Sequence, residues 1–549
     1  MNFIENETAQ KLRGGYYTPF DLALFLTRWV AEITPRRILE PSCGDGVFME
    51  SIAEVPAVRN AHIMGFELEP DEAAKADFRV KSAGLKEASI LNEDFLGWAL
   101  KGMWSSNVQF DAVLGNPPFI RYQYLPAQFQ DSAERIFKGL NLPFTKHTNA
   151  WVPFILASLK MLRPGGRLAM VVPAEIIHVT HAQSLRSYLG HNCRRVVIVD
   201  PEDLWFEGTL QGAVILMAEK KQDPDDKSEG LGIYPVKGRD FVSLNPADVF
   251  EAPKAINGET VIGKWTRALL DADTRSLFND ICMHQDVHKF KDIAKVEVGI
   301  VTGANKFFLV SDDVVKTNHL EKWAHPMFGR SEHCPGIIYD NRQHLENARK
   351  GFPANFIWFK DGFEGLDKYA AEYISQGETD SLHTRYKCRI RTPWFKVPSV
   401  HASEIGMLKR SHNTPRLILN ELGAYTTDTA YRIKSYSIPA AKLVGCFVNP
   451  LTALSAELES RHYGGGVLEL IPSEINKLMI ATPDVEIDLV KLDEAIRTRS
   501  THEVLTRQGW IVLGAMGVSR SDQDRILEGW RMLRDRRHRS TSDPLDELT

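Results

Sequence analysis

The chain contains the stretch Phe110-Asp111-Ala112-Val113-Leu114-Gly115-Asn116-Pro117-Pro118-Phe119, from which the architecture of its N-terminal half can be predicted. Two consecutive prolines fix two φ angles and push the residue before each toward extended conformations. The apolar run therefore predicts a buried strand that ends in a rigid turn. Ligands of open α/β sheets bind at this carboxyl edge. The Asn116 amide oxygen and the Pro117 carbonyl would be two acceptors for an exocyclic NH2 group, and the Phe119 ring could stack on a flat base.

A second apolar run lies upstream and leads into a glycine-containing turn, Arg37-Ile38-Leu39-Glu40-Pro41-Ser42-Cys43-Gly44-Asp45-Gly46. The two glycines let the backbone pass close to a ligand without a Cβ clash. The carboxylates of Glu40 and Asp45 make the turn acidic, which suits an ammonium or sulfonium group and suits a pyrophosphate poorly.

Two further predicted strand ends carry side chains that suit a nucleoside. Ile63-Met64-Gly65-Phe66-Glu67-Leu68-Glu69-Pro70 ends in acid, and Glu67 there can accept both hydroxyls of a ribose. Ile90-Leu91-Asn92-Glu93-Asp94-Phe95 offers an acceptor for an adenine amino group and a ring for its face. Taken singly, Glu67 and Asp94 are typical of solvated loop acids. Four successive strand ends that each carry a fitting side chain indicate a single binding site.

Together these motifs resemble those of the N6-adenine DNA methyltransferases of the γ arrangement, the group typified by the TaqI enzyme, and the resemblance covers nearly the whole chain. It implies an α/β fold, with a class I (Rossmann-like) S-adenosylmethionine-dependent methyltransferase domain followed by a mixed α+β target-recognition domain. It also implies a site-specific, adenine-specific DNA methyltransferase that uses S-adenosyl-L-methionine and acts on an adenine flipped out of duplex DNA.

The resemblance also implies roles for individual residues. It places catalysis on Asn116, Pro117, Pro118 and Phe119, and on Phe206, where the family has a second aromatic against the target base; the neighbouring Trp205 is the alternative. Cofactor contacts are implied for Tyr16, Thr18, Glu40, Ser42, Gly44, Asp45, Gly46, Glu67, Asp94 and Phe95. The glycine turn begins with Glu and carries Ser42-Cys43 where many methyltransferases have Asp-x-x-x-Gly-x-Gly, a variation that is common in the γ group.

Length and composition are those of a soluble globular protein. The 549 residues predict two or three domains, and 43% hydrophobic with 25% charged residues is ordinary for globular proteins. No apolar run approaches the roughly 20 residues of a membrane span, and the start has no secretory signal, so we expect a cytoplasmic protein. The six cysteines include no C-x-x-C pair, so we expect neither a zinc site nor a disulfide framework.

The net charge of −5 is unexpected for a protein that binds DNA, but the charge is unevenly distributed. Residues 380–434 contain ten Lys or Arg against four acids, interleaved with aromatic and histidine side chains. Such a mixture suits phosphates and base edges, whereas the alternative is a solvated charged face. The predicted DNA contacts are Arg385, Lys387, Arg389, Arg391, Lys409 and Arg410.

We expect a catalytic domain over residues 1–245, a DNA target-recognition domain over 260–480, and a helical extension with a polar tail over 481–549. Within the second domain, Val298 to Phe308 and Tyr463 to Leu470 each read as strand, glycine turn and strand. Residues 521–537 predict an amphipathic helix. We find no nuclease motif, so we expect a monomeric modification enzyme with a separately encoded restriction endonuclease.

Three other functions use the same turn or fold. A protein-glutamine methyltransferase has no need of a basic C-terminal half. An RNA methyltransferase acting on adenine N6 or guanine N2 remains an alternative, as does a non-catalytic DNA-recognition subunit, although the intact Asn116 turn argues against the latter. Cytosine-N4 enzymes usually carry Ser at the first motif position, so Asn116 favours adenine. The recognition sequence cannot be deduced, because base readout depends on side-chain geometry in the groove.

Overall fold

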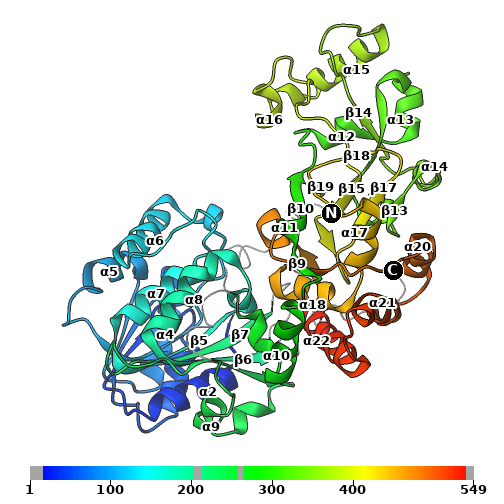
Figure 1. Ribbon diagram of the computed structural model, residues 1–549. Coiled ribbons are helices and arrows are strands. Elements are labelled where there is room, and N and C mark those ends of the chain that lie inside the picture. Colours follow the sequence, from blue (N-terminus) through cyan, green and yellow to red (C-terminus); the bar gives the residue numbers. More distant parts are fainter. Residues whose placement is uncertain (1–16, 203–204, 206–211, 257–263, 464, 539–549) are drawn as a thin grey trace. The chain divides into compact units, whose positions relative to one another are not determined.

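The computed structural model describes residues 17–202, 205, 212–256, 264–463 and 465–538. The chain divides into two compact units, Met1–Leu269 and Leu270–Thr549. Each unit has its own sheet or sheets, drawn in Figure 1, and its own hydrophobic cores. The boundaries of the three-part division expected from the sequence stay a prediction.

Unit 1 is built on an eight-stranded sheet of order β3-β2-β1-β4-β5-β7-β6-β8. Strands β3 to β5 of this order run parallel, β7 is antiparallel to both of its neighbours, and β8 is parallel to β6. The strands are β1 (Arg37–Glu40), β2 (His62–Phe66), β3 (Ala88–Leu91), β4 (Phe110–Gly115), β5 (Leu162–Pro173), β6 (Cys193–Pro201), β7 (Ala213–Lys220) and β8 (Gly230–Val236).

The chain reverses its direction of travel across the sheet between β1 and β4. From β1 it moves outward to β2 and β3, and it then returns to place β4 on the other side of β1. In an open parallel sheet such a switch point opens a crevice at the carboxyl ends of the two central strands. The glycine turn follows β1 and the Asn116 turn follows β4, so the sheet order brings the two predicted motifs together.

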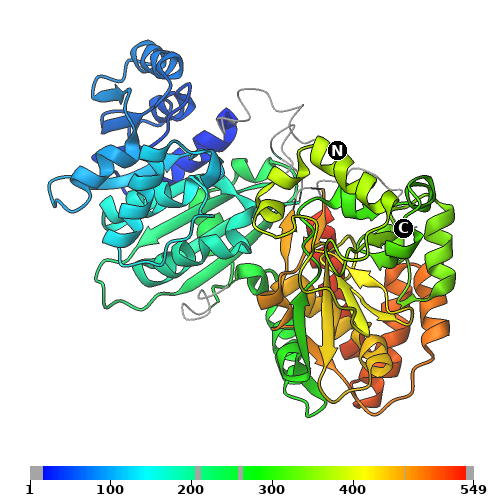
Figure 2. The same ribbon diagram turned by 90° about the horizontal axis from the view of Figure 1, so that it is seen from above.

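Helices cover both faces of this sheet (Figures 1 and 2). One core includes residues of α2 (Phe20–Ala31), α3 (Val47–Ala53), α4 (Pro70–Ser82) and α9 (Pro246–Glu251), and the other includes residues of α5 (Phe95–Gly102), α6 (Ala127–Gly139), α7 (Trp151–Met161) and α8 (Gln183–Asn192). Successive strand residues alternate between the two, as the pleat requires: Val113 belongs to one core and Leu114 to the other.

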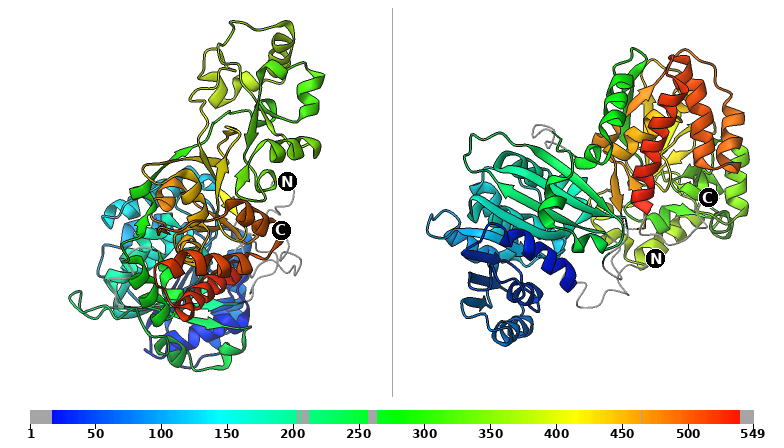
Figure 3. Two further views of the ribbon diagram at one scale, coloured as in Figure 1. Left: turned by 45° about the vertical axis from the view of Figure 1, so that its right-hand side comes forward. Right: turned by 90° about the horizontal axis from the view of Figure 1, so that it is seen from below.

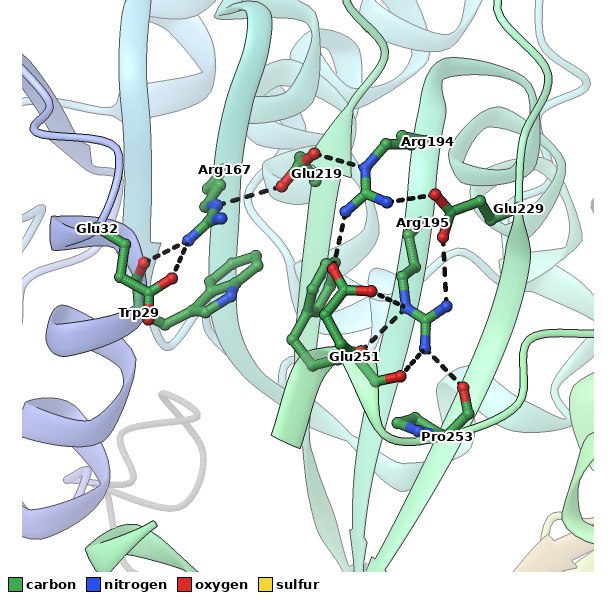
Figure 4. A network of polar contacts seen from close by, with 10 residues as sticks. Trp29, Glu32, Arg167, Arg194, Arg195, Glu219, Glu229, Glu251 and Pro253 are labelled. Atoms are coloured by element: carbon green, nitrogen blue, oxygen red, sulfur yellow. Dashed lines mark hydrogen bonds and ion pairs between the residues drawn. The ribbon is translucent and has the colours of Figure 1, made fainter. Parts of the chain in front are cut away.

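A network of ion pairs ties the sheet to α2 and α9 (Figure 4). Arg167 on β5 contacts Glu32 at 2.7 Å and Glu219 at 3.3 Å, and Arg194 on β6 contacts Glu219 at 2.6 Å and Glu251 at 3.0 Å. Arg167 is paired in register with Ala112, on the side of β4 away from its carboxyl end. The network therefore stabilises the sheet and takes no part in the site.

Unit 2 is a mixed α+β assembly of four small sheets. The largest has the order β10 (Ala294–Val298), β19 (Ala430–Ser435), β15 (Ile405–Leu408), β17 (Leu417–Asn420), β13 (Ile338–Tyr339). A second consists of β11 (Leu309–Val310), β14 (Asn355–Ile357), β12 (Ala324–Phe328) and β18 (Tyr425–Thr426), a third of β16 (Arg410–Ser411), β21 (Val467–Glu469) and β20 (Arg461–Tyr463), and the fourth of β22 (Met479–Ala481) and β9 (Val287–Lys289).

The helices of unit 2 are mostly short. They are α10 (Ala272–Cys282), α11 (Phe290–Ile293), α12 (Asn305–Phe308), α13 (Asp312–Thr317), α14 (Asn341–Arg349), α15 (Lys368–Thr379), α16 (Tyr386–Arg389), α17 (Ala440–Phe447), α18 (Pro450–Glu459), α19 (Pro472–Ile475), α20 (Leu489–Thr498), α21 (Thr501–Ala515) and α22 (Arg520–His538). The last helix, red in Figure 3, packs against α18, α21 and α10. It confirms the amphipathic helix predicted over residues 521–537, and the tail beyond it lies outside the described residues.

The fold class expected from the sequence is confirmed, with one local correction. The predicted strand after Gly303 is wrong: Asn305–Phe308 is the short helix α12. Both Phe307 and Phe308 are buried in one core, whereas a strand would send successive side chains to opposite faces. Strand β5 begins before its apolar run and includes Arg163 to Gly166, and a register irregularity against β4 accommodates this start.

Candidate active site

The turn after β4 is held by two hydrogen bonds from neighbouring segments. The Asn116 side-chain Nδ2 donates to Thr18 Oγ1 at 3.2 Å, and Ser42 Oγ donates to the Asn116 backbone carbonyl at 3.0 Å. Pro117 is buried, and Phe119 is half-buried against both cores of unit 1. The bond to Thr18 fixes the amide plane and so fixes the direction in which the side-chain oxygen points. Three predicted site residues, Thr18, Ser42 and Asn116, are thus brought together.

The two glycines of the turn after β1 serve different purposes. Gly44 has a φ of +50°, and a Cβ placed there would have no neighbour within 4 Å, so the backbone faces open space. Gly46 has a φ of +89°, and a Cβ there would lie 2.8 Å from the Ala76 Cα of α4. Gly44 therefore leaves room for a ligand beside the backbone, whereas Gly46 allows α4 to pack against the start of α3.

The Glu67 carboxylate links the end of β2 to the glycine turn. Its Oε2 accepts from the Gly44 N–H at 2.9 Å and its Oε1 accepts from the Glu69 N–H at 2.9 Å. Asn92, after β3, donates through Nδ2 to the backbone carbonyls of Glu67 and Leu68 at 2.9 and 3.0 Å. Because each carboxylate oxygen can accept a second bond, Glu67 retains acceptor capacity for a ligand. No role was predicted for Asn92 from the sequence. Its position one residue after β3 could have indicated that it belongs to the site.

Glu40 is a buried carboxyl without a hydrogen-bond partner. It is 1% exposed, and neither side-chain oxygen has a partner within the described part of the chain. Burial raises the pKa of Glu40 well above its usual range, and the neighbouring carboxylates of Asp45 and Glu67 raise it further. A buried polar group of this kind is costly unless something pairs with it. A cation bound at this turn, such as an ammonium group, would satisfy it.

Asp45 and Asp94 are anchored by the protein itself. Asp45 Oδ2 accepts from Arg79 Nη2 of α4 at 2.6 Å, yet burial outweighs this cation and raises the pKa of Asp45. Asp94 is the N-cap of α5 and accepts from the N–H groups of Leu96 and Gly97, both at 3.1 Å. The capping bonds orient the Asp94 carboxylate at the carboxyl edge of the sheet, where its predicted adenine contact stays a prediction.

Phe95 differs from the expectation. Its ring is 2% exposed and packs in the core against Phe66, Trp98 and Phe154, with centroid separations of 5.4, 6.4 and 5.3 Å. The ring is therefore a core side chain and presents no face on which an adenine could stack. The sequence could not distinguish these cases, because an aromatic residue at the first position of a helix suits either environment.

Two predicted site residues, Tyr16 and Phe206, lie outside the described residues. Trp205, the alternative to Phe206, is stacked on Phe241 with centroids 5.6 Å apart, and its Nε1 donates to the Gly238 carbonyl at 3.4 Å. Trp205 is thus a packing residue of unit 1.

A link not predicted from the sequence connects the segment after Phe119 to the neighbouring strand. The Ala150 N–H donates to the Ile120 carbonyl at 2.9 Å, and Asn149 Nδ2 donates to Glu175 Oε2 at 3.1 Å, just after β5. These bonds tie the exit of the Asn116 turn to the start of α7 and the end of β5. Glu175, two residues after the buried strand β5, could have indicated this link in the sequence.

The predicted DNA contacts in unit 2 fall into three groups. Arg385, Lys387 and Arg389 are exposed on and beside α16. Lys409 and Arg410 instead pair with the buried Glu469, at 3.3 and 2.6 Å. Arg391 is half-buried and donates to the carbonyls of Val301 and Thr302, both at 2.7 Å. The first group is the better placed to contact phosphates.

Two further features are absent from the described residues. No group of three or more His, Cys, Asp or Glu side chains is arranged to hold a metal ion. No helix is both long and apolar enough to cross a membrane.

Two family models match the sequence of this chain. Residues 2–233 match the family model for N-6 DNA Methylase, and residues 262–513 match that for the C-terminal domain of Type II methyltransferase M.Eco57I. The first match covers most of unit 1 and the second most of unit 2, and together they support a type II N6-adenine DNA methyltransferase.

Individual relatives are distant. Type II methyltransferase M.AccI of Acinetobacter calcoaceticus is 22% identical over 480 residues, which cover 85% of this chain and 84% of that protein. Type II methyltransferase M.BanIII of Aneurinibacillus aneurinilyticus is 26% identical over 291 residues, 49% of this chain and 47% of that protein. The structure of the type IIG restriction endonuclease BpuSI aligns at 13% identity with a TM-score of 0.43, covering 97% of this chain and 67% of that one, and is too dissimilar to carry an argument.

Proposed function

We propose that the chain methylates N6 of an adenine at a specific site in duplex DNA, with S-adenosylmethionine as the methyl donor. The observation that carries the proposal is the Asn116 turn, held by Thr18 and Ser42 at the switch point of the sheet. Similarity to the N-6 DNA methylase model and to type II methyltransferases supports the reaction class, and the geometry supports the assignment of individual residues.

The residues around the glycine turn fit this cofactor. Glu40 offers an ammonium group two buried oxygens that have no partner among the described residues. Gly44 leaves open space beside the backbone, and Glu67 retains acceptor capacity for ribose hydroxyls. Asp94 would accept from the adenine amino group. When bound, the cofactor supplies a methyl group activated by a sulfonium sulfur.

The chain's own residues prepare the nucleophile. The target base must leave the duplex because its N6 cannot be reached while it is stacked. The Asn116 side-chain oxygen and the Pro117 carbonyl accept the two N6 hydrogens, which draws the nitrogen toward tetrahedral geometry and localises its lone pair. Phe119 stacks on the base, a contact worth about 1–3 kcal/mol. Positioning and fixed dipoles account for the rate, and the mechanism needs no strong base before transfer.

Transfer of a tritiated methyl group tests the proposal. Purified protein is incubated with labelled S-adenosylmethionine and either duplex DNA or structured RNA, and the product is digested to nucleosides. The proposal expects label in N6-methyldeoxyadenosine from DNA alone. Label in RNA nucleosides would favour the RNA methyltransferase, and no transfer to any substrate would favour a non-catalytic recognition subunit.

Replacing Glu67 tests the cofactor assignment. A hydrogen bond to a charged acceptor contributes about 1.5–3 kcal/mol, so Glu67→Ala should weaken S-adenosylmethionine binding by roughly that amount. DNA affinity should change little, since the predicted DNA contacts belong to unit 2. Calorimetry with unchanged cofactor affinity would remove Glu67 from the cofactor site.

The partners of the protein are proposed in less detail than its catalytic residues. Duplex DNA is the proposed substrate, and the exposed cations beside α16 are its proposed phosphate contacts. A separately encoded restriction endonuclease, a monomeric state and a cytoplasmic location stay predictions.

A further inference from the structure

Unit 2 contains a cavity of about 610 Å³ that the sequence does not foreshadow. Its walls come from three segments: residues 298–301 at the end of β10, residues 387–392 around α16, and residues 396–399, with Arg432 of β19 beside them. Residues 298–301, the stretch 387–399 and Arg432 are far apart in sequence, so the cavity is a product of the fold of this unit.

Two arginines join the walls. Arg391 donates to the carbonyls of Val301 and Thr302, and Arg432 donates to the carbonyls of Ser399 at 3.0 Å and Val298 at 2.8 Å. Gly303 lets α16 approach, because a Cβ at this position would lie 2.7 Å from the Lys387 Cβ. The cavity is therefore preformed and does not depend on a ligand for its shape.

The charge of the cavity is of one sign. Lys387, Arg391, Lys396 and Arg432 line it, and none of the described lining residues is acidic. The two arginines are engaged with backbone carbonyls, whereas Lys387 and Lys396 are exposed and, in the described part of unit 2, contact no carboxylate. A polyanion is the complementary partner.

Exposed aliphatic side chains accompany these cations. Val298 is 46% exposed, Val301 37% and Ile390 62%, and all three line the cavity. A surface that only neutralised phosphates would gain nothing from them. In the major groove the apolar group on an unmodified base edge is the C5 methyl of thymine, and aliphatic side chains are its usual contacts.

We infer that this cavity reads a thymine of the recognition site: Ile390, with Val298 and Val301, contacts the C5 methyl group while Lys387 and Lys396 hold flanking phosphates. The inference rests on the proposed function and deepens it, because it assigns specificity-determining residues to unit 2.

The test uses DNA that lacks the methyl group. One genomic fragment is amplified either with thymidine triphosphate or with deoxyuridine triphosphate. The two duplexes then differ only in the C5 methyl groups and contain the same adenines. The recognition sequence need not be known. Methyl transfer by the full-length protein is then compared on the two fragments. Burying one methyl group contributes a factor of about four, so kcat/KM should fall about fourfold on the deoxyuridine fragment.

Two variants localise the effect. Ile390→Ala should transfer equally to both fragments, with an unchanged unfolding midpoint because the side chain is exposed. Leu345→Ala, an equally aliphatic and 45% exposed residue on α14 away from the cavity, should keep the wild-type ratio.

Equal wild-type rates on the two fragments would overturn the inference and leave the proposed function standing; a protein partner in the cavity predicts this result. A fourfold fall that Ile390→Ala retains would place the methyl contact elsewhere and also overturn it. Absence of transfer to the thymine fragment would overturn the proposed function itself.

Discussion

Glu40 is deeply buried and has no hydrogen-bond partner among the described residues, so the stability that it contributes should depend on pH. Its folded-state pKa lies well above the ordinary value of 4.5, so the folded protein keeps a proton that the unfolded chain releases. The stability that this carboxyl contributes is complete below the ordinary pKa and is lost as the pH rises through the folded pKa.

Glu40→Gln, which cannot ionise, should therefore become more stable than the wild type as the pH rises above about 4.5. The difference should grow as the pH rises from 5 to 8, because the unfolded wild-type chain releases a proton that the folded state holds. Urea denaturation of both proteins at several pH values without ligand measures it. A difference that stays constant over this range would show that Glu40 ionises normally.

The sequence could predict which residues lie at the strand ends, but it could not predict how far each side chain is buried. Asn116, Glu67 and Ser42 lie at one edge because strand order places them there, and apolar runs with turns make such order predictable. The ring of Phe95 was assigned to a ligand and belongs to the core. Its burial depends on Phe66 and Phe154, which are distant in sequence, and no local pattern encodes that contact.

At the scale of elements, Arg389 at the end of α16 and Arg391 just after it lie in different environments, although the sequence predicts the same role for both. Arg389 is exposed beside Tyr386, with its guanidinium 5.6 Å from the ring centroid, whereas Arg391 binds two backbone carbonyls. The sequence places both in one basic stretch, and the difference arises because the chain turns after α16 and directs one of them inward.

We expect the two single replacements to act differently. Arg389→Ala should flatten the plot of log K against log salt for duplex DNA by about 0.9, the contribution of one phosphate. Arg391→Ala should instead lower the free energy of unfolding by about 1.5–3 kcal/mol, because charged hydrogen bonds to two carbonyls are lost. Binding isotherms at several salt concentrations and urea denaturation separate the two effects. An unchanged slope for Arg389→Ala would leave α16 as a solvated face.

The short helix α12 illustrates a limit on predicting elements. Its glycine turn and apolar residues match a strand pattern as well as a helical one, and four residues are too few for periodicity to decide. The hairpin of β20 and β21 follows the same kind of pattern and is confirmed. The two outcomes differ because Phe307 and Phe308 both pack into the core, a tertiary requirement.

At the scale of the molecule, the C-terminal helix is anchored to unit 2 by a buried ion pair. Arg537 contacts Glu457 of α18 at 2.7 Å, and both side chains are 0% exposed. Arg537 also donates to the carbonyls of His412, at 2.5 Å, and Asn413, at 3.1 Å. The end of α22 therefore holds a loop that is remote in sequence, which explains why the C-terminal segment is part of this unit.

Removing one partner of such a pair leaves an uncompensated charge and costs about 3–5 kcal/mol, so Arg537→Met should destabilise unit 2 by that amount. Arg531→Met, which breaks a surface pair with Glu528, should cost about 0–1 kcal/mol. Cofactor affinity should be unchanged in both, since Glu40 and Glu67 belong to unit 1. Urea denaturation and calorimetry provide the two readouts, and equal stability of the two variants would refute the anchoring role.

The central claim is that the Asn116 turn prepares the adenine nitrogen, and it is tested most directly by Asn116→Ala. Removing one preorganised polar contact of this kind lowers the rate by about 10²–10³. The account predicts a fall of that size in single-turnover methyl transfer to duplex DNA, with S-adenosylmethionine affinity by calorimetry unchanged. Transfer at more than half the wild-type rate by a variant that still binds the cofactor would contradict it.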